Sequence, residues 1–130
     1  MKKKLVSLLM CAAMVSSMGL GVFAAEETEA AADNSDITIG SVIMNNSGEW
    51  FAEVIKGQED AAADLGINFS MVSSDNEISK ESDNVATFMA QGVDALVISP
   101  LAVDASVAAI ETATKDAGIP VVTWNTTVNT

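Results

Sequence analysis

Arginine, histidine and tyrosine are absent from this sequence, and cysteine occurs once, at Cys11. Without histidine, the chain cannot build a Ser-His-Asp triad or a histidine-ligated metal site from its own residues. Cations are also scarce: 6 lysines face 18 acidic residues, and the net charge is −12. Because such a surface repels phosphate, we expect no nucleic-acid partner. We also expect no metal site and no cofactor.

The sequence also lacks the common catalytic motifs. No GxGxxG, GxxxxGK[ST] or GxSxG occurs, which excludes the usual nucleotide cradles and the nucleophile elbow. Glu59 and Asp60 lie together on a predicted helix surface, where solvation is a simpler explanation than acid–base catalysis. A phosphoryl-receiver domain would need acids where Asn45 and Asn46 stand. We therefore expect no catalytic residues and no enzymatic activity.

The first 24 residues have the pattern of a secretory signal peptide. Lysines at positions 2–4 precede an apolar run over residues 5–23, and small residues at Val22 and Ala24 predict cleavage after Ala24. The alternative is a retained membrane anchor, but the run is near the lower length limit for a spanning helix. Glycines near the end of the run also favour cleavage. We expect an exported protein, in the periplasm or on the extracellular face, with no membrane insertion after cleavage.

Cys11 has two interpretations. It could carry the lipid of a mature lipoprotein, or it could be a small apolar residue of the signal core. Met10 is too large for the position before a lipidated cysteine, so lipoprotein anchoring is not expected. Residues 25–36 are acidic, alanine-rich and without a hydrophobic period, which predicts a disordered leader. The folded domain is predicted over residues 37–130.

Strand-like and helix-like segments alternate through this domain. β-branched apolar runs predict strands, and helical spacing of apolar residues predicts helices. The strands are expected at 37–44, 67–72, 93–99 and 119–124, and the helices at 49–65, 79–91 and 104–117. Gly66, Gly92 and Gly118 follow the three helices as left-handed stops, 26 residues apart (92 − 66 and 118 − 92). The side chains expected to face inward are Phe51, Val54, Ile55, Ala62, Leu65, Val85, Phe88, Met89, Val107, Ala108, Ile110, Ala113 and Ala117.

This alternation predicts an α/β fold, a doubly wound parallel sheet with the order β-α-β-α-β-α-β. The strands are apolar on both faces, as expected where helices cover both sides of a sheet. In such sheets ligands bind beyond the carboxyl ends of the strands. The loops at that edge are residues 45–50, 73–78, 99–104 and 125–130.

Those loops are rich in Asn, Ser, Asp and Thr, and Trp50 and Phe51 open the first helix. Amides and hydroxyls with aromatic faces suit a neutral polyhydroxyl ligand. The alternative is that turns favour these polar residues for backbone reasons. Phe51 could equally be a core residue, whereas Trp50 lies off the apolar stripe and is the better stacking candidate. Trp124 is interpreted as a core residue at the rim. Asn125 is expected to project toward the ligand edge, and its alternative role is an Asx turn.

The segments ITIGSVIMNN, KGQEDAAADLGINF, NVATFMAQGVDALVISP and AIETATKDAGIPVVTWN resemble the N-terminal lobe of type I periplasmic sugar-binding proteins, the ribose/galactose-type components of ABC transporters. The resemblance implies one lobe of a two-lobe fold that closes on a sugar. The ligand-binding residues it implies are Asn45, Asn46, Trp50, Phe51, Ser99, Asn125 and Thr126. Asn125 and Thr126 stand where the family often has an Asp-Arg pair, so a pentose preference does not follow.

The resemblance implies that the protein binds a small-molecule sugar and delivers it to an ABC transporter permease. An alternative is an extracytoplasmic sensing domain that partners a chemoreceptor or sensor kinase; a cytoplasmic repressor is disfavoured by the signal peptide. Family members are about two domains long, so the chain corresponds to one lobe, truncated. We expect weak or undetectable sugar binding by this lobe alone, because much ligand burial would be missing.

Overall fold

The computed structural model describes residues 34–129. The predicted signal peptide and residues 25–33 of the predicted leader lie outside this range. Within it, no helix has the length and apolar character needed to cross a membrane.

The described chain alternates strands and helices in the predicted order. The elements are β1 (Asn34–Ile43), α1 (Glu49–Leu65), β2 (Ile67–Ser73), α2 (Ile78–Gln91), β3 (Ala95–Ile98), α3 (Val107–Glu111), the π-helical segment η1 (Thr112–Asp116) and β4 (Val121–Thr123). The range of α1 is the predicted one, and the other elements differ from their predicted ranges by a few residues at one or both ends.

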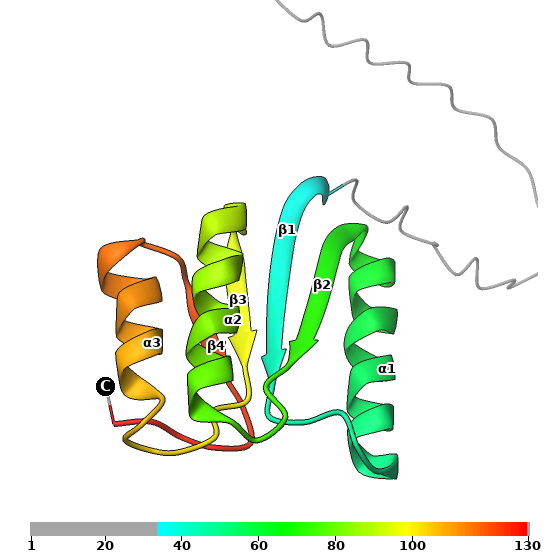
Figure 1. Ribbon diagram of the computed structural model, residues 1–130. Coiled ribbons are helices and arrows are strands. Elements are labelled where there is room, and N and C mark those ends of the chain that lie inside the picture. The colour runs from blue at the N-terminus through cyan, green and yellow to red at the C-terminus, as the bar shows by residue number, and fades with distance from the viewer. Residues whose placement is uncertain (1–33, 130) are drawn as a thin grey trace, which may run out of the picture.

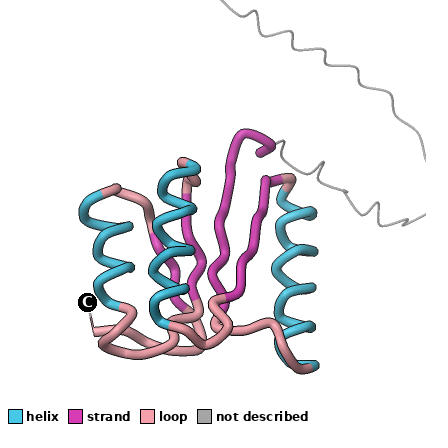
Figure 2. The backbone as a smooth tube through the Cα atoms, in the orientation of Figure 1, coloured by secondary structure: helices cyan, strands magenta, loops and turns pink. Residues whose placement is uncertain are grey.

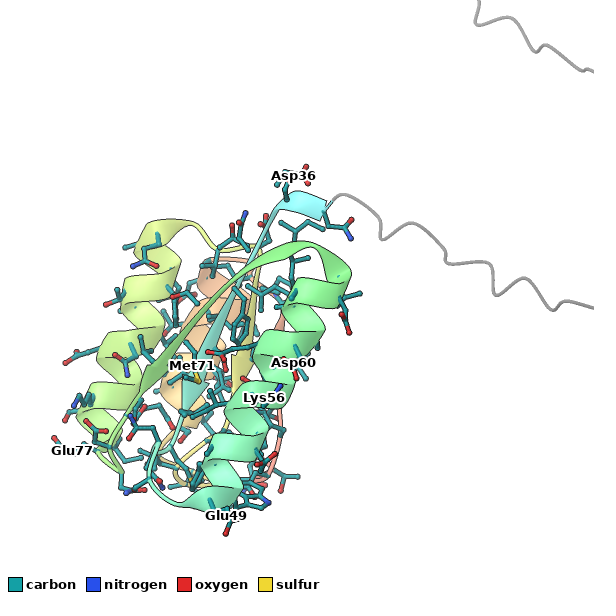
Figure 3. All side chains as sticks on the ribbon, turned by 90° about the vertical axis from the view of Figure 1, so that its right-hand side faces the viewer. Asp36, Glu49, Lys56, Asp60, Met71 and Glu77 are labelled. Atoms are coloured by element: carbon teal, nitrogen blue, oxygen red, sulfur yellow. The ribbon has the colours of Figure 1, made fainter. Side chains whose placement is uncertain are left out.

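The four strands form one parallel sheet in the order β2-β1-β3-β4 (Figure 1). Seen edge-on, the sheet lies between α1 on one side and α2 on the other (Figure 3). The predicted doubly wound α/β architecture is therefore confirmed. The strand order reverses between β1 and β3, which is where ligands bind in this class of sheet.

Alternation along the strands assigns each side chain to one of the two faces. Gly40 and Val42 of β1 face α2, while Ser41 faces α1 and donates a hydrogen bond to Oε1 of Gln58 at 2.8 Å. The main core lies on the α2 side, and its residues are Val42, Val85, Phe88, Val93, Leu96, Ile98, Ile110 and Ala113.

Most of the expected inward residues are at least half-buried, but three are not. Leu65 at the end of α1 is 55% exposed, and Ala108 and Ala117 are exposed as well. All three lie at helix ends or on the flank of the apolar stripe, where the sheet no longer covers the helix. The three predicted glycine stops do adopt left-handed conformations, with φ of 66° at Gly66, 73° at Gly92 and 69° at Gly118.

The first strand begins earlier than predicted. β1 starts at Asn34, so residues 34–36, assigned to the disordered leader, belong to the sheet. Asn34 pairs with Ile67 and donates its side-chain amide to the carbonyl of Leu65 at 2.8 Å. A register shift separates this pairing from the regular ladder that begins at Thr38. The composition of residues 25–36 could not show that β1 begins at Asn34, because the Asn34 side chain bonds a carbonyl 31 residues away.

The third helix is shorter and less regular than predicted. Residues 104–106 form a turn in which Ser106 Oγ accepts the N–H of Ala102 at 3.2 Å, so α3 begins only at Val107. From Thr112 the helix widens to a π-helix. The hydroxyls of Thr112 and Thr114 bond the carbonyls of Ala108 and Ile110, both at 2.9 Å. Such back-bonding competes with the α-helical ladder and favours a wider turn.

Because all strands are parallel, their carboxyl ends meet at one edge of the sheet. The loops that follow the strands gather there, at the lower end of Figure 2. Glu49 and Glu77, at the starts of α1 and α2, lie at this same end (Figure 3). We call it the carboxyl edge.

Candidate functional site

The loop after β1 is held in shape by Asn45. Its Oδ1 accepts the backbone N–H and the hydroxyl of Ser47, both at 3.1 Å, which forms an Asx turn. Its Nδ2 donates to Oδ1 of Asn76 in the loop after β2, at 3.3 Å. Asn45 therefore joins two loops of the carboxyl edge, and its amide is engaged within the protein. Asn46, the next residue, is exposed at this edge.

Trp50 and Phe51 contact each other at the start of α1. Their ring centroids are 4.8 Å apart and their planes meet at 80°, an edge-to-face arrangement. No sugar ring fits between rings at that separation, so the two aromatics form one wall. Trp50 is 54% exposed and Phe51 is half-buried, so more than half of Trp50 is accessible to solvent.

Trp124, at the end of β4, also belongs to this wall. Its ring centroid lies 5.9 Å from that of Trp50, with the planes tilted by 38°. The sequence supported only a rim core position for Trp124. The contact with Trp50 could not be inferred from spacing, because it joins residues 74 positions apart in the chain (124 − 50).

Ser99 lies beneath the surface at the end of β3. It is 0% exposed, its N–H donates to the carbonyl of Val42 at 2.9 Å, and its hydroxyl has no hydrogen-bond partner among the described residues. The residue occupies the predicted edge, but its side chain is covered in this arrangement. Contact with a ligand would require the covering side chains to move.

Asn125 and Thr126 form a tight turn directly after Trp124. The N–H of Thr126 donates to the carbonyl of Trp124 at 2.7 Å, around Asn125 in a left-handed conformation with φ of 67°. This bond between residues two apart is that of a γ-turn. The exposed Asn125 directs Nδ2 to the sulfur of Met44 at 3.8 Å. Asn125 thus contacts Met44, the residue that follows β1.

The loop after β2 is ordered by its own charges. Lys80 donates to Asp75, and the hydroxyl of Ser73 donates to the same carboxylate at 2.7 Å. The hydrogen bond from Lys80, followed by that from Ser73, lowers the pKa of Asp75 below its ordinary value. The hydrogen bond to Asp75 and the charge of that carboxylate raise the pKa of Lys80. Asp75 and Asn76 have positive φ values of 50° and 62°. The side chains of Asp75 and Lys80 are both exposed, so their ion pair orders the loop with little effect on overall stability.

Glu81 is a buried acid that the sequence analysis did not single out. It is 1% exposed, in the first turn of α2, and its Oε2 accepts the N–H of Leu101 at 2.8 Å. Oε1 has no hydrogen-bond partner in the described chain. Glu81 precedes Val85 and Phe88 by four and seven positions, on the buried face of α2. That spacing was the available signal, since a charge on an apolar stripe is unusual.

The predicted residues come from three loops and lie together at the carboxyl edge. Two open hollows lie elsewhere: one of about 370 Å³ between α1 and β2, and one of about 350 Å³ between α2 and α3. Neither is lined by a predicted site residue. Within residues 34–129, no group of three or more Asp, Glu, Cys or His side chains is placed to hold a metal ion.

Comparison with known proteins identifies the family. The family described as "Periplasmic binding protein domain" matches residues 39–130. The chain belongs to this periplasmic binding protein family. Its members are solute-binding proteins rather than enzymes. The chain corresponds to a single lobe of the type I fold, as the sequence resemblance predicted.

Relatives with assigned names extend the comparison. The chain is 32% identical to the ABC transporter periplasmic-binding protein YphF of Escherichia coli, over 89% of this chain and 34% of that protein. It is 34% identical to the ribose import binding protein RbsB of Bacillus subtilis, over 70% of this chain and 30% of that protein. The crystal structure of a galactofuranose binding protein superposes with a TM-score of 0.68 and 26% identity, over 72% of this chain and 31% of that one. The chain spans about a third of the length of the curated relatives it matches.

Proposed function

We propose that this protein is an extracytoplasmic solute-binding component that binds a sugar and delivers it to an ABC transporter permease, without catalysis. The observation that carries the proposal is the aromatic wall of Trp50, Phe51 and Trp124 at the carboxyl edge of the sheet. Two named relatives, an ABC transporter periplasmic-binding protein and a ribose import binding protein, support the same class.

The chemistry of this edge suits a neutral ligand with many hydroxyls. An indole face covers the C–H side of a sugar ring and excludes water from it. Asn46, Asn125 and Thr126 supply amide and hydroxyl groups that both donate and accept hydrogen bonds. Residues 124–129, which follow β4, include no carboxylate and no guanidinium, so this loop offers neutral polar groups. We therefore expect modest affinity.

The proposed route of export has its own test. If residues 1–24 are a signal peptide, the exported protein begins at Ala25 and remains outside the cytoplasm. Amino-terminal sequencing or intact mass measurement of the protein recovered from the cell envelope checks this. A mature protein that retains residues 1–24 would support the membrane anchor instead.

Sugar binding is testable by intrinsic fluorescence, because both tryptophans of the chain lie in the aromatic wall. We would titrate the full product of the gene with D-ribose, L-arabinose, D-galactose, D-allose and D-fructose, with L-leucine as the control solute. At least one sugar should change the emission in a saturable manner, and Trp50→Leu should abolish the change. Calorimetric titration that detects no sugar of this panel would contradict the proposal.

Delivery to a permease needs a cellular measurement. Deletion of the gene should lower uptake of the sugar that the protein binds, and expression of the wild-type gene should restore it. If the protein binds the sugar but deletion of its gene leaves uptake unchanged, the proposed delivery to a permease is wrong. The protein would then fit better as an extracytoplasmic sensing domain.

A further inference from the structure

Trp124 is placed by the sheet rather than by the loop. Its N–H donates to the carbonyl of Ile98 at 3.1 Å, which continues the β3–β4 ladder one residue beyond Thr123. By strand alternation Trp124 lies on the same face as Val122, whose side chain is 60% exposed, and away from the main core. This is the face that α1 partly covers, and there the indole meets Trp50.

The turn after Trp124 ties its position to the centre of the sheet. The Thr126–Trp124 hydrogen bond closes the chain around Asn125, and Asn125 contacts the sulfur of Met44 directly after β1. A left-handed, non-glycine residue at this point is a conformation that proteins tend to retain near functional sites. The end of β4 is thereby anchored to the end of β1.

Within the aromatic wall, Trp50 is the middle ring. Phe51 meets it edge-to-face at 4.8 Å, and Trp124 lies against it at 5.9 Å with a tilt of 38°. Trp124 is half-buried, whereas more than half of Trp50 is exposed. Trp50 is therefore supported on two sides and presents its remaining surface to solvent.

Two polar atoms at the carboxyl ends of β3 and β4 are buried without hydrogen-bond partners in the described part of the chain. They are Nε1 of Trp124 and Oγ of Ser99. Ser99 and Trp124 directly follow the neighbouring strands β3 and β4, and strand alternation places both side chains on the same face of the sheet. A buried donor without a partner costs stability, and a phenylalanine at position 124 would avoid that cost. Stability alone therefore does not account for an indole here.

We propose that Trp124 is a positioning residue of the sugar site, which holds the Trp50 indole over the carboxyl edge with one face free for the ligand. This inference rests on the proposed function and adds a specific role to a residue outside the predicted site. Preorganised aromatic surfaces bind better because less side-chain freedom is lost on binding.

The geometric part can be tested without any ligand. Two indoles in close, non-parallel contact couple their electronic transitions and give a paired positive and negative band in far-ultraviolet circular dichroism. The wild-type chain should show this couplet, and both Trp124→Phe and Trp50→Phe should lose it. Trp50 is largely exposed, so Trp50→Phe should fold even if Trp124→Phe does not. The control is Phe69→Leu, which removes an aromatic ring at the hollow between α1 and β2, and it should retain the couplet.

The functional part uses the sugar that responds in the fluorescence panel. Trp124→Phe should weaken its binding about tenfold, the upper range for a lost aromatic contact. Phe69→Leu should leave the affinity unchanged. Because Trp50 and Trp124 act as one unit, the double variant should bind no worse than the weaker single variant.

Three outcomes separate this inference from the proposed function. Absence of the couplet in the wild-type chain, or its survival in Trp124→Phe, overturns the positioning of Trp50 by Trp124. Unchanged sugar affinity in Trp124→Phe also overturns it. A wild-type protein that shows the couplet but binds no sugar overturns the proposed function, and the contact between the two tryptophans stands.

Discussion

Gly40 lies directly beneath the ring of Phe88, where β1 passes under α2. A Cβ atom built on Gly40 would lie 2.8–2.9 Å from three carbons of that ring. β1 is hydrogen-bonded on both sides, to β2 and β3, so it cannot retreat from the helix. The missing side chain of Gly40 therefore sets how closely α2 packs on the sheet.

We expect Gly40→Ala to lower the free energy of unfolding by about 1–3 kcal/mol, the usual cost of overpacking a core. Chemical denaturation of the wild type and the variant would measure the difference. Shortening the opposing ring should relieve the clash, so Phe88→Leu should cost less in the Gly40→Ala background than in the wild type. Equal costs in both backgrounds would show that the two residues are not coupled.

At the scale of elements, α2 is attached to the sheet by more than apolar contacts. Glu81, Val85 and Phe88 form its buried face, and the Glu81 carboxylate accepts the N–H of Leu101 in the loop after β3. This hydrogen bond links the beginning of α2 to the loop that starts at the candidate site residue Ser99. The position of that loop thus depends on the packing of α2.

Glu81→Ala removes the carboxylate that accepts the N–H of Leu101. That N–H, on a half-buried residue, is then left without its partner. We expect this change to lower the free energy of unfolding by about 1–3 kcal/mol. Glu81→Gln should cost less, because an amide oxygen can accept the same bond. Glu53→Ala, at an exposed position of α1, is the control and should change stability by less than about 0.5 kcal/mol. Thermal or urea unfolding would measure all three, and equal losses for Glu81→Ala and Glu53→Ala would refute the role of Glu81.

At the scale of the whole molecule, the two layers of helices are unequally packed. α1 buries only Ala62, whereas α2 buries three side chains and shares the main core with α3 and η1. Open hollows of similar volume lie beside both helices, one between α1 and β2 and one between α2 and α3, so the difference lies in the buried side chains. The sheet is therefore sealed more completely on the α2 side than on the α1 side.

We expect α1 to open locally at a lower free energy than α2 and the central strands. Segments with little buried apolar surface exchange their amide hydrogens through such local openings. In hydrogen exchange under native conditions, amides in the middle of α1 should exchange faster than those in the middle of α2, β1 and β3. Equal protection across all four elements would contradict this expectation and show that the domain opens as one unit.

Local sequence patterns were sufficient to predict which elements form and in what order. Val85 and Phe88 in α2 are at helical spacing and face the core, as are Ile110 and Ala113 in the next helical segment. Gly66, Gly92 and Gly118 follow the helices in the left-handed conformation. These features depend on neighbours within a few positions of each residue. The same holds for the family resemblance, which is carried by contiguous segments. The role of the proposed site residues in ligand binding stays a prediction, as does the disordered leader upstream of residue 34.

Other features required partners that are distant in sequence. The start of β1 at Asn34 depends on Leu65 and Ile67, and the burial of Glu81 depends on Leu101. The contact of Trp124 with Trp50 depends on the parallel sheet that brings β4 and α1 to one edge. Periodicity in one segment carries no information about which other segment will cover it. The alternation of strands and helices, and with it the edge where the loops meet, was thus set by local sequence, whereas the contacts between the aromatic and polar groups at that edge arose from long-range packing.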